Sequence, residues 1–474
     1  MARSHPVFDW SSVPFWAFLA LLVWIPVPLG SNRAWAWTAL EAWIFILIAA
    51  CLVLWAARML AVSDALRASW PALVVLSFWL AEQTLHVLSL PPSWVEALSP
   101  EAFRMHSLTQ VLGMKPEAMT LSVDPHAARV SLMKSFAYSG AFFLALALFN
   151  RRSRVLMACR VLVYSAVVYS VYAVLLHLAS VTKVWFGALI AYETWPTGTY
   201  ANRNHFAGYL EMMLAIGIGL LISSLSERRI DSWKKLARVT IEWILSPKML
   251  LRLGLCVLVI ALTTTHSRMG NTGFFVSLLI AGTIGITLSK HATRNTVLLL
   301  VSLIVIDLII VGSWFGVEKL TERLQETTID DVREREAPAA YTIPLVKDYL
   351  VFGAGPGSFY TVFPKYRPES ITLYYNLAHN DYAQFAAESG LLGIGLVGLF
   401  VTMGLVCAFI AQYRRRDPLM RGMSFACMMG VTAILIHSWT DFNLQIPANA
   451  TFFMVLLALG WISLFHDRRG AHEI

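Results

Sequence analysis

The residues best suited to chemistry in this chain are His379, Asn380 and Asp381, which stand just before the apolar segment 391–410. A histidine side chain titrates near neutral pH and can act as a general base. An ionisable side chain placed within a bilayer costs about 2.5–3.5 kcal/mol on insertion scales, so such residues are treated as functional candidates. An ordinary interfacial segment would also carry polar residues here. We expect a polar cavity at this helix start, built by the rest of the chain.

Two arginines stand at comparable positions beside other hydrophobic segments. Arg203 precedes the apolar residues 205–225, and Arg268 separates two further apolar stretches. A guanidinium group stays charged near lipid and donates two parallel hydrogen bonds to phosphate oxygens. One such arginine alone would be interpreted as reaching to lipid headgroups, whereas two indicate a site for an anionic ligand. The polar residues predicted to accompany them are Asn202, Asn204, Asn380, His379 and, more weakly, Arg129.

Other ionisable residues within apolar segments have simpler expected roles. Glu82 and His86 lie four residues apart, on one face of a predicted helix, and should hydrogen-bond to each other. Glu211 is expected to pair with a buried cation, and Asp441 lies near the end of a span. The spacings typical of metal ligands do not occur, so the sequence predicts neither a metal site nor a cofactor.

Composition places the chain in a membrane. It has 474 residues, of which 57% are hydrophobic and 14% are charged, and its mean hydropathy is +0.62. Many windows exceed the length of uncharged apolar sequence that marks a spanning helix. The net charge of +8 does not indicate nucleic-acid binding, because the basic residues form short clusters between spans. The fold class predicted is an all-α polytopic membrane protein with membrane lipids as its surroundings.

About twelve spans can be counted, and the basic residues orient them. Every basic cluster follows an even-numbered span, so all clusters lie on one side, which the positive-inside rule makes cytoplasmic. Both termini are then cytoplasmic as well. The predicted spans cover approximately residues 13–30, 37–57, 70–90, 131–149, 158–179, 205–225, 250–265, 272–289, 296–314, 390–411, 420–438 and 449–465.

The longest segment on the opposite side lies between the ninth and tenth spans. It divides the chain into residues 1–314 with nine spans, a large loop at 315–389 that carries His379, and residues 390–474 with three spans. Within the loop, Gly353–Gly357 is interpreted as a plain turn, because it lacks the lysine and preceding strand of a phosphate-binding loop. In an earlier loop, Pro125 is predicted to open a helix.

These motifs together resemble those of a known family. His379-Asn380, nine further residues and then Gly390-Leu391-Leu392-Gly393 resemble the signature of the bacterial O-antigen ligase and O-antigen polymerase superfamily. The strings at 202–208, 265–270, 353–359 and 366–367 are also similar to that superfamily. Residues 122–129 resemble the lead-in to the fourth span of exopolysaccharide members. The resemblance covers approximately residues 120–465.

The resemblance implies a GT-C-like fold with a large helical periplasmic loop and a metal-independent, inverting glycosyltransferase of the bacterial inner membrane. Its donor would be a glycan on undecaprenyl diphosphate, and its site would face the periplasm. By motif position, His379 would deprotonate the acceptor hydroxyl, and Arg203 and Arg268 would hold the diphosphate. The acceptor would be another lipid-linked glycan in a polymerase, or lipid A–core in a ligase. The strings at 122–129 and 202–208 favour a polymerase slightly.

A twelve-span secondary transporter is the alternative from a different class. Such transporters usually show two similar halves and a cytoplasmic loop at the middle of the chain. Here the longest loop is external and lies between the ninth and tenth spans, and the halves show no similarity. The sequence therefore favours an enzyme over a transporter.

Overall fold

The computed structural model describes residues 9–108, 113, 117–180, 183–185, 188–190, 195–224, 247–288, 301–302, 305, 329–369 and 374–466. This part of the chain is almost entirely helical, with one hairpin formed by β1 (Lys183–Trp185) and β2 (Ala188–Ile190). Eight of its helices are long and apolar enough to cross a membrane. The predicted all-α polytopic membrane fold is therefore confirmed. The predicted ninth span, 296–314, lies almost wholly outside the described residues, so the total of twelve stays a prediction.

The helices fall into three groups. The candidate spans are α2 (Ala34–Ala56), α7 (Pro125–Leu148), α8 (Arg152–Leu178), α9 (Arg203–Ser223), α12 (Arg268–Leu288), α17 (Asp381–Arg414), α18 (Pro418–His437) and α19 (Pro447–Phe465). Shorter helices within the bundle are α1 (Ser12–Trp24), α4 (Trp70–Leu85) and α11 (Pro247–Thr264). The connecting helices are α3 (Asp64–Ala68), α5 (Pro92–Leu98), α6 (Pro100–Ser107), α15 (Ile329–Asp348) and α16 (Phe359–Val362), with short 3-10 turns η1 (Leu29–Ser31), η3 (Phe363–Lys365) and η4 (Asn443–Gln445).

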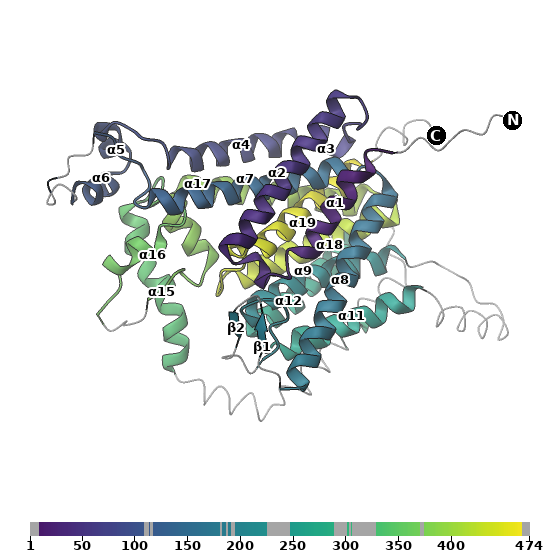
Figure 1. Ribbon diagram of the computed structural model, residues 1–474. Helices are drawn as coiled ribbons and strands as arrows, with labels where there is room; N and C mark the ends of the chain where they lie inside the picture. Colours follow the sequence, from purple (N-terminus) through teal and green to yellow (C-terminus); the bar gives the residue numbers. More distant parts are fainter. Residues whose placement is uncertain are drawn as a thin grey trace, which may run out of the picture.

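The centre of the bundle is formed by α9, α18 and α19, which Figure 1 shows enclosed by the other helices. Every residue of α9 from His205 to Ile222 is buried, as expected for a helix that is apolar on all sides. Helices α9 and α18 cross at two glycines, since a Cβ on Gly219 would collide with the carbonyl of Gly422. Small residues at a helix crossing allow the close packing that holds membrane helices together.

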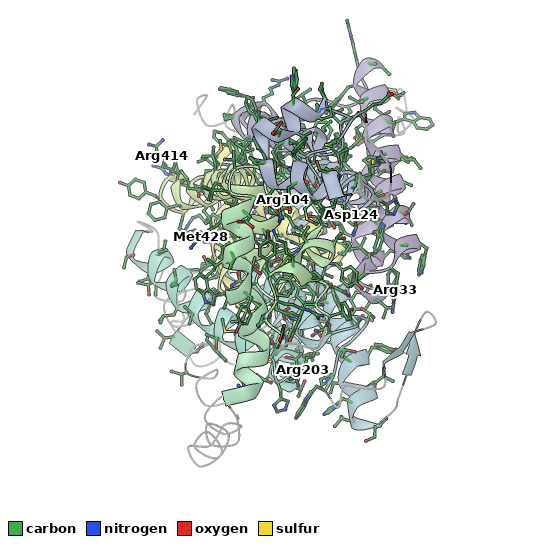
Figure 2. The ribbon with its side chains drawn as sticks, turned by 90° about the vertical axis from the view of Figure 1, so that its left-hand side faces the viewer. Arg33, Arg104, Asp124, Arg203, Arg414 and Met428 are labelled. Atoms are coloured by element: carbon green, nitrogen blue, oxygen red, sulfur yellow. The ribbon has the colours of Figure 1, made fainter. Side chains whose placement is uncertain are left out.

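The two ends of the bundle differ in character. At one end, polar contacts link described members of the basic clusters: Arg151 pairs with Asp9 at 2.9 Å, and Arg152 pairs with Asp417 at 3.1 Å. At the opposite end, α5, α6, α15 and α16 form a small subdomain outside the spans (Figure 1). Figure 2 views the molecule from this second end, with Arg104 of α6 labelled. Two ends of different composition are expected when successive loops lie on alternate sides of a membrane.

The subdomain has its own hydrophobic core and surface ion pairs. Its buried residues come from two distant stretches of the chain and include Val95, Ala102, Leu345 and Phe359. On its surface, the Lys365 ammonium donates to the Glu101 carboxylate at 2.5 Å. Part of the predicted long loop is therefore folded against residues 90–102 and 119–121.

A backbone junction fastens this subdomain to α17. The N–H groups of Ala354 and Gly355 donate to the carbonyls of Ala387 and Glu388, at 2.8 and 3.0 Å. A Cβ on Gly353 or on Gly390 would collide with main-chain atoms of the facing segment, and both glycines have positive φ, 77° and 61°. Glycine is needed at such positions because it lacks a Cβ. The chain turns at Gly353–Gly357, as predicted, and Gly390 forms a kink inside α17.

The helix starts can be compared with the predicted span limits. Helix α7 begins at Pro125, as predicted, and the Asp124 carboxylate caps it by accepting from the Ala127 N–H at 3.0 Å. Helix α17 begins at Asp381, before the apolar span predicted from residue 390. The first turns of α17 are therefore part of the polar end of the bundle, and they bring His379 close to the spans.

Candidate functional site

Three membrane helices begin together at the end that carries the subdomain, each with a polar cap. The Oδ1 atom of Asn202 accepts a main-chain N–H from the first turn of α9 at 2.8 Å. Ser267 Oγ does the same for α12 at 3.2 Å, and Asn380 Oδ1 does so for α17 at 3.0 Å. Such caps are the usual way to satisfy the free N–H groups of a helix start. The N-terminus of a helix also carries a partial positive charge, so these starts favour an anion nearby.

Arg203 and Arg268 are the first residues of α9 and α12. A cation in the first helical turn opposes the helix dipole, which costs about 0.3–1 kcal/mol at each helix. The Arg203 guanidinium lies 5.4 Å from the centre of the Trp195 ring, and that ring lies 4.0 Å from the imidazole of His266. An arginine at the first position of each of two neighbouring helices is understandable if the site holds a negatively charged ligand.

His379 lies immediately before the cap of α17 and contacts two aromatic rings. Its imidazole is 4.8 Å from the ring of Phe442 and 6.0 Å from that of Tyr375. Its backbone has φ of 52°, a left-handed conformation that non-glycine residues seldom adopt, and His266 has φ of 51° at the equivalent position before α12. Backbone strain of this kind is often found at functional sites. Both histidines are turned by the chain reversal that starts a helix.

Phe442 connects His379 to a second histidine. The ring of Phe442 lies 4.6 Å from the imidazole of His205, which is almost fully buried in the first turn of α9. The two histidines therefore contact the same aromatic side chain. His205 comes from the string at 202–205 that the sequence singled out, and the tertiary structure brings it to the loop that follows α18.

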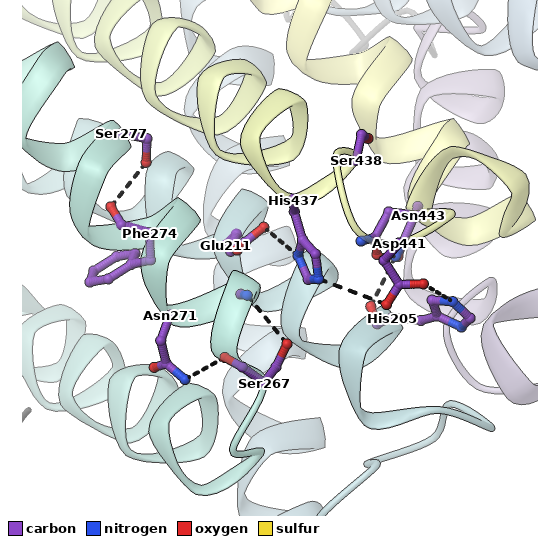
Figure 3. Close-up of polar contacts among 12 residues, drawn as sticks. His205, Glu211, Ser267, Asn271, Phe274, Ser277, His437, Ser438, Asp441 and Asn443 are labelled. Atoms are coloured by element: carbon purple, nitrogen blue, oxygen red, sulfur yellow. Dashed lines mark hydrogen bonds and ion pairs between the residues drawn. The ribbon is translucent and has the colours of Figure 1, made fainter. Parts of the chain in front are cut away.

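From His205, a line of buried ionisable groups leads into the bundle (Figure 3). His205 Nε2 is 3.4 Å from Asp441 Oδ1, and the other carboxylate oxygen is 3.9 Å from His437 Nε2. His437 Nδ1 is in turn 3.3 Å from Glu211 Oε2. The four side chains come from α9, the end of α18 and the loop after it. Buried charges are stable only when paired, so the alternation of imidazole and carboxylate explains how they are tolerated.

Asp441 is the central acid of this line and lies outside the spans. Burial by itself would raise the pKa of the Asp441 carboxyl, but the neighbouring imidazoles of His205 and His437 hold that pKa well below its usual range. Asp441 is thus an anion at neutral pH. The loop therefore places a negative charge 3.4 Å from the His205 imidazole, next to Phe442 in the chain.

The loop that carries Asp441 is fixed by the start of α17. The Asp381 main-chain N–H donates to the carbonyls of Ser438 and Asp441, at 2.9 and 3.1 Å. The Asp381 carboxylate accepts from the Ser438 hydroxyl at 2.8 Å and from the Leu444 N–H at 3.0 Å. The contacts of Phe442 with His205 and His379 therefore depend on the start of α17, which directly follows His379.

One part of the chain is similar to a known family. A family model described as O-antigen ligase matches residues 253–398. The match runs from α11 through α12 and the large loop into α17, and so includes Arg268 and His379. It confirms the resemblance to the O-antigen ligase and polymerase superfamily. No curated protein matches the chain.

The members of this family are glycosyltransferase-like membrane enzymes, and lipid-linked glycans and their acceptors are the partners that the family implies. In the present chain, several predicted residues gather at one end of the bundle. Asn202, Arg203, Arg268 and Asn380 all occupy the starts of α9, α12 and α17, and Asn204 lies half-buried in the first turn of α9. Arg129 is exposed in the first turn of α7, a helix outside this group. The roles assigned to these residues stay predictions.

Two contacts expected between buried ionisable residues are present in the structure. His86 Nε2 lies 2.9 Å from a Glu82 oxygen, which confirms the predicted contact. The partner of Glu211 is His437, a residue that the sequence argument did not single out. A spacing of four residues between His437 and Asp441 at the end of an apolar segment was the available signal. In the described part of the chain, no three His, Cys, Asp or Glu side chains are grouped to hold a metal ion.

Proposed function

We propose that this chain is an inner-membrane glycosyltransferase that moves a glycan from undecaprenyl diphosphate onto an acceptor sugar hydroxyl at the periplasmic face. The observation that supports it most directly is the meeting of three capped helix starts, two of which begin with arginine. This arrangement suits a diphosphate, because main-chain N–H groups, helix dipoles and guanidinium groups all favour anions. The proposal divides the chain into residues 1–314, 315–389 and 390–474, in a GT-C-like arrangement of about twelve spans with both termini in the cytoplasm.

In the proposed reaction, His379 takes the proton of the acceptor hydroxyl. The oxygen then forms a bond to the anomeric carbon of the donor sugar, and the bond from that carbon to the diphosphate oxygen breaks. Arg203 and Arg268 bind the diphosphate as negative charge develops on it, which is the usual role of positioned cations at a leaving group. Attack opposite the leaving group inverts the anomeric centre. The charge stabilisation in this scheme comes from the protein, so the proposed mechanism uses no metal.

Asp441 has a positioning role in this proposal, because it contacts His205 and not the reacting atoms. We expect Asp441→Asn to lower the transfer rate about 10- to 100-fold, as loss of a partner that orients a catalytic site commonly does. Asp441→Glu keeps the carboxylate and should restore part of the rate. If the role of Asp441 were only structural, Asp441→Glu would be as slow as Asp441→Asn.

The proposal favours a polymerase, with a ligase as the second candidate because the matching family model is described as O-antigen ligase. The test is reconstitution of the purified protein in vesicles with a lipid-linked repeat unit, either alone or with lipid A–core. A polymerase should lengthen the lipid-linked glycan in both preparations. A ligase should produce glycosylated lipid A–core only in the second. Failure to transfer glycan in either preparation would contradict the proposed function.

A further inference from the structure

A cavity of about 160 Å³ lies within the bundle between α4, α7, α17 and α19. Its apolar lining includes Leu76, Leu396, Val397, Phe400 and Phe453. An apolar cavity of about 150 Å³ in an engineered protein holds one benzene molecule, so this one has room for a short segment of a single hydrocarbon chain. It is distinct from the starts of α9 and α12, which carry the two arginines, because neither of these helices contributes to its lining.

Polar groups line the part of the cavity nearer the subdomain. Gln83 Nε2 donates to Ser389 Oγ at 3.1 Å and to the Glu82 carboxylate at 2.7 Å. Glu388, also in the lining, accepts from Gln384 Nε2 at 2.7 Å and from the Phe359 N–H at 3.2 Å. The carboxylates of Glu82 and Glu388 thus already accept hydrogen bonds from the protein. A ligand in the cavity would bind to a different polar group of the lining.

That group is Lys134, the one cation among the described residues that line the cavity. Its ammonium lies 3.9 Å from the centre of the Trp37 ring. Among the described residues it makes neither a hydrogen bond nor an ion pair within 4.0 Å, although Glu41 and Glu388 are near enough to interact with its charge. A lysine in a membrane helix is costly unless it serves a ligand or a pathway. A cation above an apolar cavity is complementary to an anionic headgroup on a hydrocarbon chain.

The cavity is separated from His379 by one short loop. Leu444 and Gln445 of η4 line the cavity, while Phe442, just before them, contacts His379 and His205. A glycan attached to a lipid in the cavity would therefore need to pass only this loop to reach His379. The arginines lie at the starts of α9 and α12, and the cavity is bounded by other helices, so two lipid-borne substrates can occupy different sides of the same histidine.

We propose that this cavity binds the lipid chain of the acceptor, and that Lys134 binds its phosphate. The inference rests on the proposed glycosyltransferase function and deepens it. The occupant we commit to is a polyprenyl phosphate lipid with a single chain, because the cavity is too small for the several acyl chains of lipid A. This assignment also favours polymerisation over ligation, since the acceptor of a polymerase is itself carried by a polyprenyl chain.

Lipid binding tests the cavity directly, with undecaprenyl phosphate as the probe and native mass spectrometry of the purified full-length chain as the readout. We expect the wild-type protein to bind two lipids. Lys134→Met, which keeps the length of the side chain without its charge, and Ser139→Leu, which fills the lining, should each bind one. The matched control is Met133→Leu on the exposed face of α7, which should bind two. An Arg203→Ala, Arg268→Ala double variant should keep the lipid at Lys134.

Kinetics distinguish this inference from the proposed function. In the reconstituted polymerase reaction, Lys134→Met should raise the KM for the lipid-linked acceptor about tenfold and leave the KM for the donor unchanged. Lys134→Arg, which keeps the positive charge, should have the wild-type KM for the acceptor. Two bound lipids in both Lys134→Met and Ser139→Leu would overturn the inference, as would displacement of the second lipid by lipid A. Absence of transfer by the wild-type protein would instead count against the proposed function, because the binding assay does not depend on turnover.

Discussion

His379→Ala should abolish glycan transfer while the protein still inserts into the membrane. General base catalysis typically contributes 10²- to 10⁴-fold to a rate, and an acceptor hydroxyl is a poor nucleophile while it keeps its proton. The side chain is half-buried at the start of α17 and contacts Phe442 and Tyr375, so its removal leaves the buried core intact. The measurement is the amount of polymer formed by the reconstituted variant from a lipid-linked repeat unit, compared on a gel with the wild-type product.

The unusual backbone of His379 calls for a second variant. With φ of 52°, this position is strained for most residues, and alanine could disturb the helix start as well as the chemistry. Asparagine tolerates the left-handed conformation but cannot act as a base. His379→Asn should therefore be as inactive as His379→Ala, with an unchanged melting temperature. Normal polymer from either variant would exclude the proposed role of this histidine.

Arg203→Lys and Arg268→Lys should each reduce the donor kcat/KM by about 10- to 100-fold. Lysine keeps the positive charge, but it lacks the planar fork that donates two hydrogen bonds to a phosphate group. A hydrogen bond to a charged group contributes about 1.5–3 kcal/mol, which corresponds to a factor of this size. Because lysine keeps the positive charge at the helix start, its interaction with the helix dipole is the same, and the substitutions should leave the melting temperature unchanged.

The matched control for these variants is Arg151→Lys. Arg151 lies at the other end of the bundle and forms an exposed ion pair with Asp9, which contributes little to stability. The Arg151→Lys variant should transfer glycan at the wild-type rate. If both Arg203→Lys and Arg268→Lys behaved like this control, with unchanged donor kcat/KM, then the anion bound at the helix starts would not be the diphosphate of the donor.

Several features could be predicted from the sequence because they depend on neighbours in the chain. Long apolar segments make helices that span a membrane, since backbone polar groups in lipid must be hydrogen-bonded within the segment. The helix start at Pro125, the turn at Gly353–Gly357 and the Glu82–His86 contact follow from short spacings, and the structure agrees with each. The sequence also indicates His379, Arg203 and Arg268 as candidate site residues, because ionisable side chains beside apolar segments are energetically costly.

Other features depend on packing between distant segments. The line from His205 through Asp441 and His437 to Glu211 uses residues from α9, α18 and the loop after α18, and only the crossing of α9 and α18 brings them together. The glycines at 353 and 390 are recognisable as turn residues, but their contact across the subdomain junction is a tertiary feature.

The sequence by itself determined the membrane class, the helix start at Pro125 and the residues with suitable chemistry, because hydrophobicity, capping and side-chain charge are local properties. The tertiary structure decided which of these residues are neighbours. It placed His205 and His379 on one phenylalanine, gave Asp441 two histidine partners, and positioned Lys134 beside an apolar cavity. Such contacts form between segments far apart in the chain, and their geometry depends on how complete helices pack, which no local pattern records.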